Sequence, residues 1–245
     1  MRQLDDRSAI GPAQESLAIR RRSGDLSGIA RSLWVLGLIA TVIHDIAEFR
    51  RYTEESAEFA RRAGDGWALS MALSNLGYMA LDAEDLDQAV PLFGEALALA
   101  RLRGDRRSEA FFLENLALAK LEQHSPIDAR ADFLDSLRLA QRLGFIEVEA
   151  TDLVGLAAVA AAQGDHLGAA RLLGRAGRLL DETGGRWDRV EDRVYVRTLA
   201  DIERRLGTKA LASALADGRS GPTTDIADGL SDPAGRSDPA ADQSL

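Results

Sequence analysis

Five glycines recur along this 245-residue chain at intervals of 40 residues, at positions 24, 64, 104, 144 and 184. The first three are each followed by an aspartate. A glycine just past a helix supplies the left-handed conformation that ends it, and an aspartate can cap the next helix. The chain is therefore predicted to repeat a helical unit every 40 residues.

A second set of marks lies about midway between the glycines, at Asp45, Asp85, Ser125 and Asp165. Asp45 and Asp85 are followed three residues later by glutamate or glutamine, as a capping box requires. Pro126 suits the first position of a helix. Each unit is thus predicted to be a helix of roughly 18 residues, a short turn and a second helix of similar length.

Apolar residues follow the same register. Leucines align at 33, 73, 113 and 153 and again at 36, 76, 116 and 156, and small residues align at 37, 77, 117 and 157. Spacings of three and four residues place such positions on one face of a helix. The pattern predicts an all-α solenoid of helical hairpins.

The run Leu76-Gly77, Ala89, Phe93 and Ala96 resembles the tetratricopeptide repeat, and the resemblance covers roughly residues 9 to 200. It implies a right-handed superhelical solenoid of antiparallel helical hairpins that binds a protein or peptide segment. The usual unit has about 34 residues, so a 40-residue period is a departure. Longer units resemble the helical sensor regions of bacterial LuxR and maltose-activator-type ATPase transcriptional regulators.

The expected organisation has four parts. Residues 1–24 form an incomplete first repeat with only its second helix, 25–184 form four hairpins, 185–218 form capping helices, and 219–245 form a disordered tail. An uncovered first helix could arise in a shortened relative of a longer protein, or residues 1–10 could fold over as an irregular cap. An uncovered helix also permits self-association.

Charge and composition exclude several classes of function. The net charge is -9 and the pI is about 5.0, which argues against direct nucleic-acid contact. The chain has no cysteine, so disulfides and thiolate chemistry are excluded. The longest apolar run, Leu33 to Ile43, is about half the length that spans a bilayer. We expect a cytoplasmic protein without membrane contact.

No motif for catalysis is present. The chain lacks the P-loop, the H-E-x-x-H motif and the nucleophile elbow. His44 and His124 fall at turns two units apart, which is roughly 20 Å at ordinary helix spacing, too far for one metal ion. We therefore expect no catalytic, metal or cofactor site and a non-enzymatic protein; a hydrolase on a helical scaffold is the least favoured alternative.

The first helix of each unit lines the concave side in the family that the chain resembles. Carried over by register, the candidate partner-binding residues are Arg31, Trp34, Leu38, Met71, Ser74, Tyr78, Phe111, Glu114, Leu118 and Thr151. Their apolar character suits an apolar or amphipathic segment, or a small apolar inducer. The alternative is that tight curvature buries them between helices, in which case Glu114 needs a partner such as Arg31 or a ligand.

Two functions remain open. One is an interaction module that recognises a protein segment. The other is a ligand-sensing C-terminal region of an ATP-dependent bacterial transcriptional regulator, detached from its ATPase or truncated.

Overall fold

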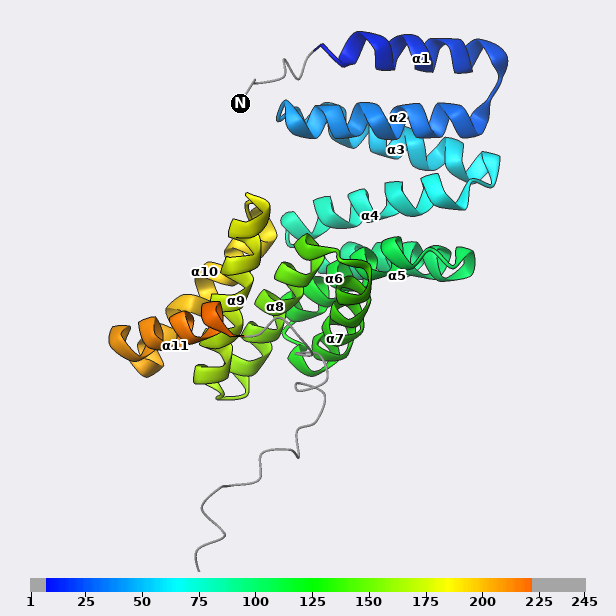
Figure 1. The fold of residues 1–245 in the computed structure, drawn as a ribbon. Coiled ribbons are helices and arrows are strands. Elements are labelled where there is room, and N and C mark those ends of the chain that lie inside the picture. Colours follow the sequence, from blue (N-terminus) through cyan, green and yellow to red (C-terminus); the bar gives the residue numbers. More distant parts are fainter. Residues whose placement is uncertain (1–7, 222–245) are drawn as a thin grey trace, which may run out of the picture. The chain divides into compact units, whose positions relative to one another are not determined.

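The computed structural model describes residues 8–221, and within that range all regular structure is α-helical (Figure 1). The eleven helices described are α1 Ile10–Ser23, α2 Leu26–Val42, α3 Ile46–Ala63, α4 Gly66–Asp82, α5 Leu86–Arg103, α6 Arg106–Glu122, α7 Pro126–Leu143, α8 Ile146–Ala162, α9 His166–Thr183, α10 Arg189–Leu206 and α11 Thr208–Ser220. The predicted all-α fold of successive helical hairpins is confirmed.

The helices keep the 40-residue period throughout. The first helices of the hairpins, α2, α4, α6 and α8, begin at residues 26, 66, 106 and 146. The second helices, α3, α5, α7 and α9, begin at residues 46, 86, 126 and 166. By its register α1 corresponds to a second helix, because its end at Ser23 lies 40 residues before the end of α3 at Ala63.

The chain divides into two compact units, of which the first ends at Ser125 and the second begins at Pro126. In the first unit, α1 to α6 pack in chain order, each against the next, and α2 also contacts α4. In the second unit, α7, α8 and α9 pack in order, α10 lies against α8 and α9, and α11 packs mainly on α9. The core of each unit is therefore built from helices that are near neighbours in the sequence.

The helix ends follow the local signals of the sequence. Six aspartates accept a hydrogen bond from the backbone amide three residues later, at 2.9 to 3.2 Å; they are Asp25, Asp45, Asp65, Asp85, Asp105 and Asp165. The five recurring glycines all have positive φ, between 63° and 72°. Phe145 stands where the other units have aspartate, and α8 accordingly begins without a side-chain cap.

Glycines inside the helices allow close approach of large side chains. A Cβ built on Gly77 would lie 2.8 Å from the fully buried Phe93 ring, and one on Gly155 would lie 2.1 Å from the Phe133 ring. Real Cβ atoms do not approach carbon atoms so closely, so both rings depend on the missing methyl groups. These contacts set the close packing of α4 against α5 and of α8 against α7.

Two further glycines bring α9 and α11 into backbone contact. A Cβ on Gly174 would lie 2.1 Å from the Leu215 carbonyl oxygen, and one on Gly218 would lie 2.0 Å from the Arg171 carbonyl oxygen. Arg178 of α9 also donates hydrogen bonds to two carbonyl oxygens at the end of α11, each at 3.1 Å. The end of α11 is therefore held closely against α9.

Several expectations fall at the edges of the described range. α10 and α11 occupy the segment expected to hold capping helices, and α11 ends at Ser220, two residues into the segment expected to be a tail. Residues 222–245 of that tail, and residues 1–7 of the expected first repeat, lie outside the described residues. None of the helices within residues 8–221 combines the length and the apolar character needed to cross a membrane.

Candidate interaction surface

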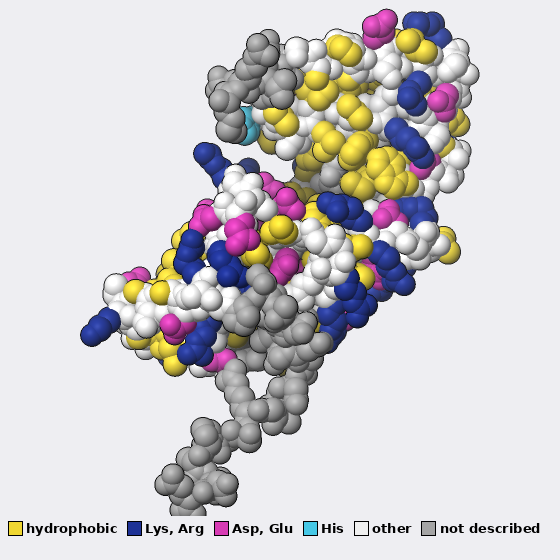
Figure 2. All heavy atoms as spheres, viewed as in Figure 1, with side chains coloured by type: hydrophobic (Ala, Val, Ile, Leu, Met, Phe, Trp, Pro, Cys, Tyr) yellow, Lys and Arg dark blue, Asp and Glu magenta, His cyan; other side chains and the backbone are white. Residues whose placement is uncertain are grey.

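The first unit exposes an apolar stripe along α2. Val35, Leu38 and Val42 are spaced by three and four residues, which places them on one face of the helix. Their exposed fractions are 41%, 41% and 53%, although amphipathic helices usually bury such a face. Figure 2 shows hydrophobic side chains gathered over the helices at the start of the chain. We call Arg31, Trp34, Val35, Leu38, Val42 and Trp67 the α2 surface.

Two tryptophans lie at one end of this surface. Trp34 of α2 and Trp67 of α4 pack edge to face, with ring centroids 5.1 Å apart and an interplanar angle of 73°. Both side chains are half-buried. The indole nitrogen of Trp34 is buried and has no hydrogen-bond partner among residues 8–221. This nitrogen is enclosed by neighbouring side chains, so the Trp34 ring and not its N–H forms the exposed part of the surface.

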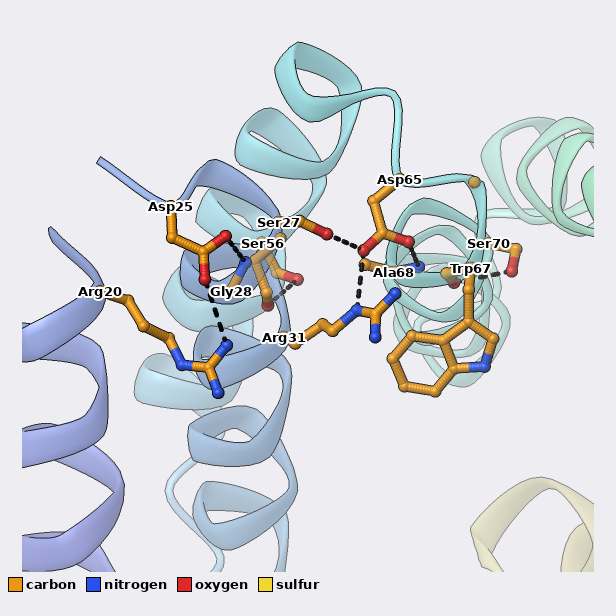
Figure 3. Close-up of polar contacts among 12 residues, drawn as sticks. Arg20, Asp25, Ser27, Gly28, Arg31, Ser56, Asp65, Trp67, Ala68 and Ser70 are labelled. Carbon is orange, nitrogen blue, oxygen red and sulfur yellow. Dashed lines mark hydrogen bonds and ion pairs between the residues drawn. The ribbon is translucent and has the colours of Figure 1, made fainter. Parts of the chain in front are cut away.

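Arg31 stands beside the two rings and is held from two sides. Its Nε donates to Asp65 Oδ2 at 2.8 Å, and its guanidinium carbon lies 5.4 Å from the centre of the Trp67 ring. Figure 3 shows the guanidinium group between Asp65 and Trp67. Because the Arg31 side chain is still 54% exposed, it can also face a partner. The guanidinium group of Arg31 is thus already oriented in the absence of a partner.

Asp65 connects the two hairpins that carry this surface. It caps α4 through the Ala68 amide and accepts hydrogen bonds from Ser27 and Arg31 of α2. Burial by itself would raise the pKa of the Asp65 carboxyl, but the hydrogen bonds from Arg31, Ser27 and the Ala68 amide outweigh it and lower the pKa to about 2. The carboxylate is therefore charged at neutral pH and fixes Arg31.

The structure divides the ten predicted binding residues into two groups. The side chains that reach the surface, fully or in part, are those of Arg31, Trp34, Leu38, Met71, Tyr78 and Phe111. The buried ones, at most 7% exposed, are those of Ser74, Glu114, Leu118 and Thr151. The first group lies in the first unit, mainly on α2 and α4. Binding by these residues stays a prediction, while burial removes the second group from direct contact.

Sequence reasoning did not single out Trp67. In the other units its register position is occupied by Ser27, Arg107 and Glu147, which are all polar. A tryptophan at a position that is otherwise polar is an unusual choice for a surface helix. The difference between Trp67 and the polar residues at its register position could have identified Trp67 as a surface residue from the sequence.

A buried polar cluster in the second unit was also missed. Asp152 of α8 is fully buried, and Glu149 and Arg175 are buried beside each other with a nitrogen–oxygen distance of 3.8 Å. Burial raises the pKa of the Asp152 carboxyl well above its ordinary value, and the Glu149 carboxylate adds to the rise. In the other units Arg175 is replaced by Glu15, Glu55, Glu95 and Asp135, and this reversal of charge was the available signal.

The charged side chains of the described residues have mainly structural roles. Across the described residues 8–221, no three histidine, cysteine, aspartate or glutamate side chains gather so as to hold a metal ion. The aspartates that recur with the period serve as helix caps. What the first unit presents is a fixed cation beside aromatic and aliphatic side chains.

Residues 67–142 match the family model of the tetratricopeptide repeat. The match runs from the first turn of α4 to the last turn of α7, and includes the Leu76-Gly77 pattern. No match is found among curated proteins. Repeats of this kind generally mediate contacts between proteins, and helical folds built from them are typically non-enzymatic scaffolds.

Proposed function

We propose that this chain is a non-enzymatic interaction module whose α2 surface binds a segment of another protein. The observation that supports the proposal best is the fixed Arg31 beside the Trp34–Trp67 pair, next to the exposed aliphatic stripe of α2. Tryptophan and arginine are the residues most enriched at the energetic centres of protein interfaces. Their clustering here selects this surface over other exposed parts of the chain.

The chemistry of the surface describes the segment that it fits. Val35, Leu38 and Val42 offer an apolar strip, which suits an amphipathic helix or an extended segment with aliphatic or aromatic side chains. Arg31 at the end of the strip suits a carboxylate, because a guanidinium group binds carboxylates through paired hydrogen bonds. The expected partner segment is therefore apolar with an acidic residue at one end.

Preorganisation supports the same interpretation. Asp65 and Trp67 already restrict the Arg31 side chain, so binding costs less side-chain entropy than it would with a free arginine. A surface whose charged group is already oriented favours binding of a specific segment over nonspecific apolar binding.

The test is a selection of peptides from a random display library against the full chain, followed by affinity measurements with variants. Leu38→Ala and Trp34→Ala should each weaken the selected peptides by about tenfold or more. Trp187→Ala is the matched control, because Trp187 is a half-buried tryptophan of the second unit that stacks on Tyr195. Equal losses with all three variants, or none with Leu38→Ala and Trp34→Ala, would rule out the α2 surface.

A second candidate function is a ligand-sensing region of an ATP-dependent bacterial regulator. The strict recurrence of the helices every 40 residues favours it, since longer units of this kind resemble such sensor regions. The α2 surface would then bind a small apolar inducer. A gene for a P-loop ATPase next to this one, together with tryptophan fluorescence that responds to apolar ligands but not to peptides, would favour the sensor over the interaction module.

A further inference from the structure

The junction between α5 and α6 carries arginines that the other hairpins do not share. α5 ends with Arg101 and Arg103 in its last turn, and α6 begins with Arg106 and Arg107. Arginines at the end of a helix stabilise its negative pole, but cations in the first turn of a helix are unfavourable. The other first helices begin without a basic residue, at Leu26-Ser27, Gly66-Trp67 and Ile146-Glu147. Helix stability therefore does not account for the arginines at the start of α6.

The carboxylate of Glu109 fixes two of these arginines. Arg101 donates through Nε to Glu109 Oε1 at 3.0 Å, and Arg106 donates through Nη1 to Glu109 Oε2 at 2.7 Å. Burial by itself would raise the pKa of the Glu109 carboxyl, but the hydrogen bonds from both arginines outweigh it and lower the pKa. Glu109 is therefore charged at neutral pH. Because two guanidinium groups meet at one carboxylate, a surplus of one positive charge remains at this place.

Both arginines keep hydrogen-bond donors that no other residue uses. Among contacts within residues 8–221, Arg101 engages only its Nε and Arg106 only its Nη1, although a guanidinium group carries five N–H donors. Their side chains are 52% and 66% exposed. Leu102, which follows Arg101, is 85% exposed. The junction thus presents two oriented guanidinium groups beside an exposed apolar side chain.

The third arginine of the junction has a structural role. Arg103 donates a hydrogen bond of 2.7 Å to the Gly66 carbonyl oxygen at the start of α4. It also pairs with Asp105, the cap of α6, at 3.1 Å, and its side chain is only 24% exposed. Arg103 therefore holds the junction against the preceding hairpin, while Arg101 and Arg106 are presented outward.

We propose that Arg101 and Arg106 bind the carboxylates of a short acidic segment of a partner protein, and that Leu102 contacts an apolar side chain of that segment. The two N–H groups at one edge of a guanidinium match the two oxygens of a carboxylate. Two guanidinium groups fixed by Glu109 can take two neighbouring acidic side chains. The site shares no residue with the α2 surface and does not rest on binding there.

The charge of the chain favours a short acidic segment over a long polyanion. A phosphate also fits a guanidinium group, but a nucleic acid carries its charge well beyond these residues and meets a chain of net charge -9. A segment with a few carboxylates places its charge only where the local surplus lies. Leu102 also offers an apolar contact that a phosphate backbone cannot make.

The test measures binding of a fluorescein-labelled peptide, Glu-Glu-Leu-Glu-Glu, to the full chain by fluorescence anisotropy. We expect saturable binding that the peptide Gln-Gln-Leu-Gln-Gln does not show. Arg101→Gln combined with Arg106→Gln should weaken binding of the acidic peptide by about tenfold or more. The matched control combines Arg50→Gln with Arg51→Gln, since both arginines are exposed and paired with glutamates of α3. This control removes the same charge and should leave binding unchanged.

Two further variants separate recognition from charge and from folding. Arg101→Lys combined with Arg106→Lys keeps both charges but removes the paired hydrogen bonds, so it should also weaken binding by about tenfold. Leu102→Ala changes a side chain that is 85% exposed, so the fold should stay intact while binding weakens by about threefold. Circular dichroism checks that each variant keeps its helical content.

Several results would overturn the proposal. One is the absence of saturable peptide binding, or an equal loss in the glutamine variant and its control. Full binding by the lysine variant would show that the junction responds to charge alone. A short oligothymidylate that binds as tightly as the acidic peptide, and loses binding in the glutamine variant, would assign the site to nucleic acid.

Discussion

Arg31 of α2 donates a hydrogen bond of 2.8 Å to Asp65, the residue that caps α4. One contact therefore joins two successive hairpins and positions the cation of the proposed binding surface. The same aspartate accepts hydrogen bonds from Ser27 and the Ala68 amide, so three donors satisfy one carboxylate whose side chain is only 5% exposed. Asp65 therefore links the stability of the fold to the geometry of the proposed binding surface, and the first predictions concern it.

Replacing Asp65 by alanine should destabilise the chain by about 2 to 3 kcal/mol, because it removes a helix cap and leaves Arg31 and Ser27 without their acceptor. Asp85→Ala is the matched control, since Asp85 also caps a helix but its capping contact is exposed. That variant should lose about 1 kcal/mol. Urea denaturation measures both values; equal losses would show that the link to α2 contributes nothing.

Stability should also fall in acid through Asp65. The pKa of its carboxyl is lowered to about 2 in the folded chain from an ordinary value of 3.8. A lowered folded pKa stabilises the fold above the unfolded pKa, and this contribution is lost as the pH falls from about 4 to 2. It amounts to about 2 kcal/mol. The difference in unfolding free energy between the native chain and Asp65→Asn should shrink over that window; a constant difference would contradict the assignment.

Asp152 should have the opposite effect on the pH dependence of stability. Burial raises the pKa of its carboxyl well above the ordinary value, so the folded chain holds a proton that the unfolded chain releases. Stability should therefore decrease as the pH rises from about 4 through the raised pKa. Asp152→Asn should flatten this dependence and stabilise the chain at neutral pH, because it removes the buried titrating group. An unchanged slope in thermal unfolding against pH would refute this.

Gly155→Ala should destabilise the chain by about 2 to 3 kcal/mol, because the added methyl group would overlap the buried Phe133 ring. Gly94 provides the control, since it is also inside a helix but a Cβ there would meet no atom within 4 Å. Gly94→Ala should stabilise the chain by up to about 1 kcal/mol through helix propensity. Chemical denaturation of the two variants measures both; a shift of the same sign in each would contradict the packing argument.

The candidate site was predictable only in part. The register placed Arg31, Trp34 and Leu38 on one face of a helix, and they do reach the surface. The same register placed Glu114 and Leu118 in that face, yet both are buried. Equivalent positions in successive units are not equally exposed, because exposure depends on the helices packed around each unit and not on the helix alone. Periodicity did not predict Trp67, because the residues at its register position in the other hairpins are polar.

The sequence by itself determined where the helices begin and end. Asp65 caps α4 and Gly64 ends α3 through interactions that span only a few residues, and such local signals act wherever the chain is placed. Tertiary structure decided what these helices present. The pairing of Arg31 with Asp65 and the contact of Trp34 with Trp67 each depend on residues brought together from different hairpins. Contacts of that kind are set by packing, which the periodicity of a single helix does not encode.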